Sequence, residues 1–395
     1  MAVPDGIWFV FIFAFGCCIG SFLNVVIYRL PRDKSLVRPP SSCPACGEQI
    51  RPYDNVPLVS WLLLGRKCRY CKAPISVRYF VIELLTGLVF VGVFYLYFRT
   101  DLRAGTGPFL GGGWLIYLLH IILLAAFTAA SAIDLELWVI PLPICWFVTV
   151  AGLIGSMLGG YIIDTADIHR HYLLPSTSDI LLKESTVASL AVGATMGLAI
   201  SGILLATGLI KRSYESEESG DSPEDAGSEE SAQPQFDHRL EMAREVIFLL
   251  PVIVCSLLTY WLVKAGAGPV SVRTWLASFS QKPAIAGLLG SLWGYFVGCG
   301  IVWATRIFGT LAFGKEAMGL GDVHLMGAAG AVIGPLFVVM AFFIAPFFGL
   351  AWAVCQMFFK KTRQIPYGPF LSLGIFTVMI LHDWIFDYLS IIFYR

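Results

Sequence analysis

Long apolar runs constrain this chain more than any other feature of its sequence. A helix needs about 20 apolar residues to cross the ~30 Å hydrocarbon core of a bilayer. Runs of this kind cover residues 7–27, 80–98, 113–133, 138–158, 187–210, 246–263, 283–304, 335–359 and 370–385. A tenth run, 323–334, is too short to span alone, so we expect a half-helix or a helix that begins inside the membrane. The sequence therefore predicts an all-α polytopic membrane protein with about nine to ten apolar helical segments.

The composition agrees with this class of protein. Hydrophobic residues make up 57% of the 395 residues and charged residues 14%, whereas soluble domains have about 25% charged residues. This excludes an ordinary soluble enzyme, a disordered chain and a collagen-like fibre. The 27 basic and 27 acidic residues cancel. We therefore expect the lipid bilayer, and no nucleic acid, as a partner.

Basic residues in short loops predict the side of the membrane on which each loop lies. Residues 30–79 contain nine Lys and Arg residues, so we expect this segment in the cytoplasm and the N-terminus outside. Alternation then places four more segments in the cytoplasm: 135–137, 211–212, 306–322 and 360–363. The first run follows Asp5 and precedes the basic residues that start at Arg29, which is not the pattern of a signal peptide.

Two polar stretches interrupt the apolar runs. Residues 213–235 contain eight acids and no base, with many Ser and Gly residues, which predicts a disordered acidic linker. Residues 159–186 form an expected outer loop with His169 and His171. Two histidines at this spacing could ligate a metal, but a solvated loop is the favoured interpretation.

Four of the ten cysteines have the spacing of a metal site. Cys43 and Cys46 form one C-x₂-C pair, and Cys68 and Cys71 form a second. Two such pairs are typical of a tetrahedral Zn²⁺ site. Free thiols or disulfides are the alternative, and disulfides are disfavoured in the cytoplasm. Four thiolates leave no open coordination position, so we expect a structural zinc that staples a domain too small to fold alone.

Two aspartates at the ends of apolar runs are candidates for catalysis, because carboxylates at the membrane border are costly. Asp134 ends one run, and Asp322 opens the short tenth run after Gly319 and Gly321. The topology places both on the cytoplasmic side at one depth. Two such acids can share one proton and activate a water for peptide hydrolysis. The glycines would let an extended substrate approach Asp322.

Other roles remain open for these positions. Asp322 is well placed to cap a helix, and Asp134 could be solvated at a helix end. Glu136 and Glu316 lie close enough in sequence to take the place of either acid. His324 could tune the charge of Asp322. His120 is interpreted as a packed polar residue within the bundle.

Several segments occur in an order that identifies a family. They are GSFLNVVIYRLP at 20–31, both cysteine pairs, DNVPLVSWL at 54–62, APISVRY at 73–79, ELLTG at 83–87, AID at 132–134, GKEAMGLGDV at 314–323 and PYGPF at 366–370. Together they resemble the prepilin peptidases. These are the bifunctional type IV leader peptidases/N-methyltransferases of bacterial pilus and type II secretion systems, which have a GxGD motif. The resemblance covers residues 7–158 and about 284–385.

The resemblance implies a concrete activity. Such an enzyme removes a basic leader from prepilins or pseudopilins at the cytoplasmic side of the bacterial inner membrane, commonly between Gly and Phe. Many members then methylate the new N-terminus with S-adenosylmethionine. Asp134 and Asp322 would be the proteolytic pair, supported by Gly319 and Gly321. The four cysteines would hold a structural Zn²⁺ in the domain associated with methyl transfer.

The chain departs from the family pattern in three places. Leu142 stands where the family usually has an Asp, and His324 where it usually has a Lys. Residues 160–283 have no clear counterpart. We expect a first transmembrane helix at 1–29, a four-Cys cytoplasmic zinc domain at 30–79 and transmembrane helices with the first Asp at 80–158. An insertion with two extra spans and the acidic linker follows at 159–283, and the helices with the GxGD motif at 284–395.

Three alternative functions compete with this interpretation. One is a prepilin-type peptidase without methyl transfer. The others are a non-enzymatic membrane scaffold that docks a partner through its zinc domain, and a transporter. A scaffold does not explain two acids at one membrane depth, and the acids of a transporter are expected nearer the bilayer midplane.

Overall fold

The computed structural model describes most of the chain. It covers residues 5–100, 108–163, 185–211, 213, 238–265, 278, 282–359, 366–381, 384–385, 387–388 and 391. The acidic linker beyond Ser213, the histidines at 169 and 171, and the segment 360–363 lie outside these residues. The expectations for them remain predictions.

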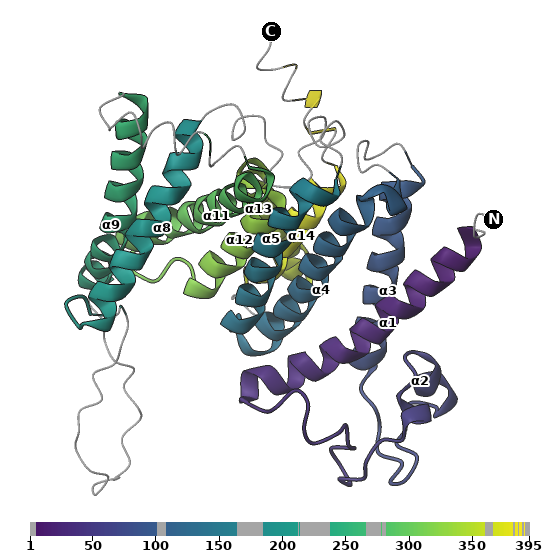
Figure 1. Cartoon of the computed structure of the whole chain (residues 1–395). Coiled ribbons are helices and arrows are strands. Elements are labelled where there is room, and N and C mark those ends of the chain that lie inside the picture. The colour runs from purple at the N-terminus through teal and green to yellow at the C-terminus, as the bar shows by residue number, and fades with distance from the viewer. Residues whose placement is uncertain are drawn as a thin grey trace, which may run out of the picture.

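Within the described residues, ten helices of more than ten residues carry the fold (Figure 1). Their bounds are α1 Asp5–Arg29, α3 Val77–Phe98, α4 Gly113–Leu137, α5 Leu142–Ile162, α8 Ser185–Ala206, α9 His238–Lys264, α11 Pro283–Phe313, α12 Leu320–Ile333, α13 Pro335–Phe359 and α14 Gly368–Ile380. A short helix α2, Val59–Leu63, lies in the four-cysteine segment. Each corresponds to one of the ten apolar runs, apart from α2, and the all-α class is confirmed.

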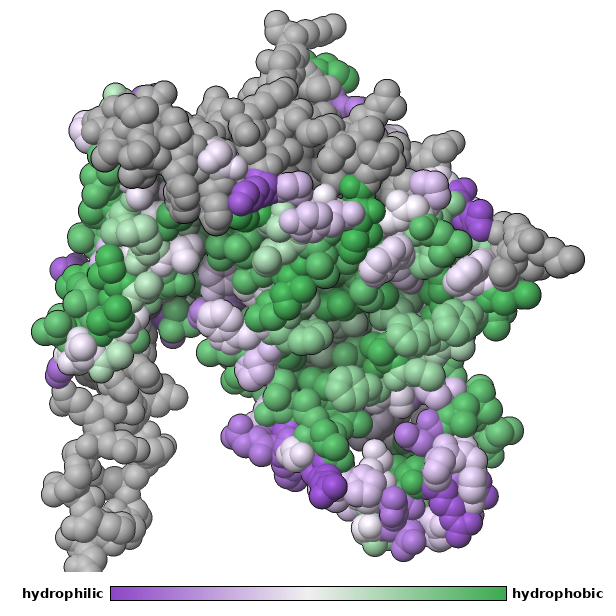
Figure 2. All heavy atoms as spheres, in the orientation of Figure 1, coloured by the Kyte–Doolittle hydropathy of each residue, from purple (hydrophilic) through white to green (hydrophobic). Residues whose placement is uncertain are grey.

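Eight of the described helices are long and apolar enough to cross a membrane, and α12 and α14 are shorter. Apolar side chains cover the middle of the face in Figure 2, whereas polar ones gather at the four-cysteine segment below it. This distribution is the one that a bilayer requires, because lipid cannot hydrate polar groups. The chain is a multi-pass membrane protein.

Two boundaries differ from the sequence-based expectation. The run 370–385 corresponds to α14, which ends at Ile380 after 13 residues and does not span alone. Arg306 was expected in a loop, but α11 continues through Phe313 and Arg306 is fully buried within it. A buried helix can carry an arginine if partners satisfy the charge, and sequence hydropathy does not show those partners.

The helices form a central group with a helix pair on either side (Figure 1). Helix α1 packs on α3, and α8 packs on α9. Both α8 and α9 also contact α11. The central group contains α4, α5, α11, α12, α13 and α14. The α8–α9 pair therefore lies beside α11, on the side away from α1 and α3.

Glycines allow the closest approach in this central group. A Cβ atom on Gly294 of α11 would lie 2.0 Å from the carbonyl oxygen of Gly330 on α12. A Cβ atom on Gly298 would lie 2.2 Å from that of Met326. Such backbone contact between small residues is how helices associate in lipid, where burying apolar surface gives no advantage. It fixes α12 against α11.

Helix α12 is short and buried on almost all sides. It begins after Gly319 and ends at Ile333, and Gly334 with φ of +86° turns the chain into α13. Eleven of its residues are buried, including Asp322. The expectation of a half-helix inside the bundle agrees with this short helix.

Candidate active site

Asp322 lies in the first turn of α12. The helix begins at Leu320 with Gly319 as its N-cap, so Asp322 is the third helical residue and not the cap. Its side chain is 8% exposed. The alternative role as the N-cap of this helix is therefore wrong.

Asp134 lies near the end of α4, three residues before Leu137. It is 7% exposed, so it is not solvated at a helix end. Its Oδ2 accepts a hydrogen bond of 3.1 Å from the N–H of Gly368, the first residue of α14. Asp134 thus joins the end of one helix to the beginning of another.

The structure brings the two aspartates together around Ile140. A Cβ atom on Gly321 would lie 2.8 Å from Cβ of Ile140, and one on Gly368 would lie 3.1 Å from its Cδ1. Gly321 adjoins Asp322, and Gly368 binds Asp134. The negative charge of Asp134 acts on Asp322, and so does the positive charge of Arg306. Asp134 and Asp322 thus lie in one buried neighbourhood around Ile140.

The two motif glycines have different surroundings. A Cβ atom on Gly319 would lie 3.6 Å from Oδ2 of Asp322 and 3.9 Å from the backbone nitrogen of Gly321, and both distances are ordinary contacts. This agrees with an opening beside the carboxylate. Gly321 instead packs against Ile140, so its lack of a side chain allows close packing of α12 rather than substrate entry.

The neighbouring glutamates have arginine partners. Glu136 is hydrogen-bonded and ion-paired to Arg78 at the start of α3. Glu316 accepts from Nη1 of Arg306 at 2.5 Å. Both glutamates are thus held in structural contacts by arginines. Among the acids that the sequence analysis considered, Asp134 and Asp322 are the two buried carboxyl groups next to each other.

The two histidines considered above lie in packed surroundings. Nδ1 of His120 is 2.7 Å from the hydroxyl of Tyr97, and the side chain is buried, as expected for a packed polar residue. The ring of His324 lies against the ring of Trp146. Its Nδ1 is 3.4 Å from the hydroxyl of Tyr295.

Two residues of this site had no assigned role in the sequence analysis. Gly368 was part of the PYGPF segment, and Arg306 was counted as a loop charge. Gly368 could have been found from the sequence, because it is a glycine before a proline at the start of an apolar run. At such a position a backbone N–H can face a ligand. The signal for Arg306 is a single charge inside α11.

The four cysteines converge as predicted. One Sγ atom from each of Cys43, Cys46, Cys68 and Cys71 lies within 4.8 Å of all the others. The Cys43 and Cys71 sulfurs are 3.7 Å apart. A tetrahedron with metal–sulfur bonds of ~2.3 Å has sulfur–sulfur edges of ~3.8 Å. The donor set therefore fits a four-coordinate metal.

The two cysteine pairs have the same backbone. The N–H of Cys43 donates to Glu48 O at 2.9 Å, and that of Cys68 donates to Ala73 O at 2.8 Å. Gly47 and Lys72 follow the two pairs at the same offset, with φ of +74° and +59°. Backbone N–H groups of Cys46 and Ala45 lower the pKa of Cys43 to about 7. This favours the thiolate that a metal needs.

The four-cysteine segment is held against the helix bundle by buried polar contacts. The N–H of Leu58 donates to Oε2 of Glu83 on α3 at 2.8 Å. Asn24 of α1 donates to the carbonyl of Tyr79 at 3.1 Å. Within the segment, Arg69 and Asp54 form a salt bridge of 2.5 Å, which lowers the pKa of Asp54. The segment thus contacts α3 through Glu83, and the Asn24–Tyr79 bond joins α1 to α3 beside it.

Comparison with known proteins places these features in one family. A model described as "Bacterial Peptidase A24 N-terminal domain" matches residues 14–97, which include the four cysteines. A model described as "Type IV leader peptidase family" matches residues 248–354, which include Asp322. The second match begins within α9. The family resemblance therefore extends into the segment 160–283, which the sequence analysis had left without a counterpart.

Curated relatives carry the same name. The "Prepilin leader peptidase/N-methyltransferase" of Myxococcus xanthus (strain DK1622) is 42% identical over 149 residues, 38% of this chain and 39% of the relative. Those of Aeromonas hydrophila and Neisseria gonorrhoeae are both 35% identical. These matches cover 40% and 37% of this chain, and 57% and 55% of the relatives. The chain thus spans about two fifths to three fifths of the length of these relatives.

No solved structure matches the chain. The two family models and the relatives agree with each other, and both the cysteine domain and the GxGD helix lie within the matched ranges. The chain is therefore similar to the type IV leader peptidase family over residues 248–354, and to curated prepilin leader peptidase/N-methyltransferases over about two fifths of its length.

Proposed function

We propose that this protein is a membrane aspartic endopeptidase that removes the leader from type IV prepilins or type II secretion pseudopilins. Asp134 and Asp322 are the proposed catalytic residues. The observation that carries the proposal is the burial of these two carboxyl groups around Ile140, close enough for their charges to interact. The printed names of the relatives support the same substrate class.

The proposed reaction needs one carboxylate and one carboxylic acid. The carboxylate takes a proton from a water molecule while the water oxygen attacks the scissile carbonyl carbon. The carboxylic acid gives its proton to the carbonyl oxygen. Collapse of the resulting diol then breaks the C–N bond, and a proton passes to the leaving amine. Two buried acids that share one proton provide both groups at once.

The hydrogen bond between Gly368 and Asp134 suggests how the Asp134 carboxylate is held in position for the reaction. The bond holds one oxygen of Asp134 on the N–H of Gly368 and leaves the second oxygen for water or substrate. The surroundings of Gly319, where an added Cβ atom would make only ordinary contacts, would accommodate an extended substrate backbone beside Asp322. We propose that this side faces the cytoplasm, because the basic four-cysteine segment follows α1 on the same side as the ends of α4 and α8 (Figure 1).

The four cysteines are proposed to hold a structural Zn²⁺. Zinc supplies the folding free energy that a segment of this size lacks. Methyl transfer from S-adenosylmethionine to the new N-terminus is proposed from the names of the relatives alone. Among the residues that the structure describes, none is assigned to the methyl donor.

Co-expression with a candidate prepilin tests this function. Mass spectrometry of the product should show the leader removed, and a mature chain one methylene heavier if methyl transfer is retained. Asp134→Asn and Asp322→Asn should each abolish cleavage. Asn at 134 can still accept the Gly368 N–H, so the fold is retained while the proton chemistry is lost. Cleavage at the parental level by either variant would refute the assignment.

A further inference from the structure

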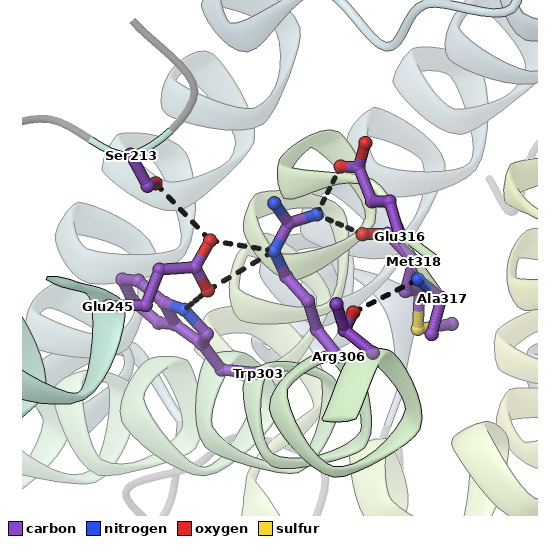
Figure 3. Close-up of polar contacts among 8 residues, drawn as sticks. Ser213, Glu245, Trp303, Arg306, Glu316, Ala317 and Met318 are labelled. Atoms are coloured by element: carbon purple, nitrogen blue, oxygen red, sulfur yellow. Dashed lines mark hydrogen bonds and ion pairs between the residues drawn. The ribbon is translucent and has the colours of Figure 1, made fainter. Parts of the chain in front are cut away.

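Arg306 joins three elements of the structure next to the candidate site. It lies on α11 and is fully buried. Its Nε donates to Oε1 of Glu245 at 2.9 Å and to Oε2 at 3.2 Å. Its Nη1 donates to Oε1 of Glu316 at 2.5 Å and to the carbonyl oxygen of Met318. Figure 3 shows the guanidinium between Glu245 and the Glu316–Met318 segment.

Glu245 belongs to α9, the second helix of the α8–α9 pair. It is 3% exposed, and Trp303 Nε1 and Ser213 Oγ also donate to it, at 2.8 and 3.2 Å. Ser213 is the first residue of the acidic stretch after α8. Glu245 lies outside both ranges that the family models match, whereas Arg306 and Glu316 lie inside the second. Glu245, which lies outside the matched ranges, therefore binds Arg306, which lies inside the second range.

The segment that Arg306 binds leads directly into the candidate site. It leaves α11 at Gly314 and reaches α12 through Gly319. The N–H of Ala317 donates to the hydroxyl of Thr310 at 3.1 Å. Met318, whose carbonyl accepts from Arg306, stands four residues before Asp322. A shift of this segment would therefore move the beginning of α12 and the Asp322 carboxylate.

Arg306 needs Glu245 in order to hold this position. A buried guanidinium without a counterion is strongly unfavourable. Glu316 is 46% exposed, so water screens its charge, whereas the side chain of Glu245 is 2% exposed. The planar guanidinium also donates in fixed directions, so fixing Nε determines where Nη1 points. Glu245 supplies both the buried counter-charge and the orientation.

We propose that Glu245 is a positioning residue for the candidate active site. By binding Nε of Arg306, it fixes the 314–319 segment and hence Asp322. The α8–α9 pair then contributes to the position of Asp322, through Glu245 on α9. The inference rests on the proposed peptidase function for its kinetic consequence, but its structural consequence is independent of the substrate.

The test compares Glu245→Gln with Glu241→Gln in the full chain, purified into lipid nanodiscs. Glu241 is a matched control, because it is also 3% exposed on α9 and pairs with Arg244 of its own helix at 2.7 Å. We expect Glu245→Gln to lower kcat for a prepilin peptide about tenfold with little change in KM, since a sub-ångström displacement of a catalytic group costs about this much. Glu241→Gln should stay near the parental kcat.

Hydrogen exchange provides a readout that does not depend on cleavage. The peptide covering 314–319 should exchange faster in Glu245→Gln than in the parent, and the four-cysteine segment should not change. Glu245→Asp, which keeps the charge, should restore part of the protection. Parental kcat and parental exchange in Glu245→Gln would overturn the proposal, and so would equal losses in Glu241→Gln.

A double variant separates positioning from the cost of a buried charge. Glu245→Gln/Arg306→Met leaves no uncompensated buried charge, because the remaining partner, Glu316, is 46% exposed and reaches water. It should therefore fold even if Glu245→Gln alone does not. We expect it to keep the fast exchange at 314–319 and the low kcat, and parental values would refute the positioning role. If the parent itself cleaves no prepilin, the proposed function fails, and the exchange data still decide whether Glu245 positions the segment.

Discussion

Gly368→Ala tests the geometry of the candidate site without removing any catalytic group. The backbone N–H of residue 368 is kept, so the hydrogen bond to Asp134 remains available. The added Cβ atom would lie 2.7 Å from Oδ2 of Asp134 and 3.1 Å from Cδ1 of Ile140. Ordinary contacts of this kind begin at about 3.4 Å, so the carboxylate or the start of α14 must move by about 0.7 Å.

This displacement sets the expected size of the effect. A misplacement of about 1 Å at a catalytic group can lower the rate about a hundredfold. We therefore expect kcat of Gly368→Ala to fall between about tenfold and a hundredfold, with zinc content and membrane insertion unchanged. The assay is cleavage of a prepilin peptide by the purified full chain.

Gly349→Ala is the control for this prediction. Its Cβ atom would meet only Phe370 of α14, at 3.7 Å, which is an ordinary contact. It adds the same methyl group to a neighbouring helix and should leave kcat within about twofold of the parent. Parental activity in Gly368→Ala would show that the Asp134–Gly368 contact does not set the position of the catalytic carboxylate.

The remaining predictions concern the metal, the neighbouring acids and the topology. Elemental analysis should find one Zn per chain, and Cys68→Ser should lose it and loosen the cysteine domain, because an incomplete site binds weakly; full zinc content with both cysteine pairs mutated would contradict this. Glu136→Gln should retain substantial cleavage, since Glu136 pairs with Arg78 rather than with the aspartates, and complete loss would mean that the wrong acid was chosen. The double variant Asp134→Asn/Asp322→Asn should be no worse than either single variant, because the two groups act as a unit. A reporter fused in 213–235 should read as cytoplasmic, and an external reading would contradict the predicted number of spans and the predicted side of the aspartates.

Much of this architecture could be read from the sequence. The ten apolar runs predicted the ten long helices, because each helix in lipid must be apolar along its whole length. The cysteine spacing predicted the convergence of four sulfurs, because each C-x₂-C pair places two thiolates on one tight turn. The pairing of Asp134 with Asp322 was proposed from their common depth. The topology thus follows from local signals that are strong in a membrane protein.

Other features depend on residues that are distant in sequence. Gly368 lies 234 positions from Asp134, and nothing in either local sequence shows that they are bonded. The two motif glycines look equivalent in the sequence. Only tertiary contacts show that a Cβ atom on Gly321 would collide with Ile140, whereas one on Gly319 would make only ordinary contacts.

The sequence by itself determined the helices, the convergence of the four cysteines and the resemblance to a family. Each of these is set by properties within a short stretch of chain, namely hydropathy over a helix or ligand spacing over a turn. The tertiary structure alone decided which acids are buried together and which are paired with arginine. It also decided that Arg306 joins α9 to the segment before Asp322. The physical reason is that burial and electrostatic partners are properties of packed helices, and the partner of a buried charge such as Arg306 can lie on another helix, far away in the sequence.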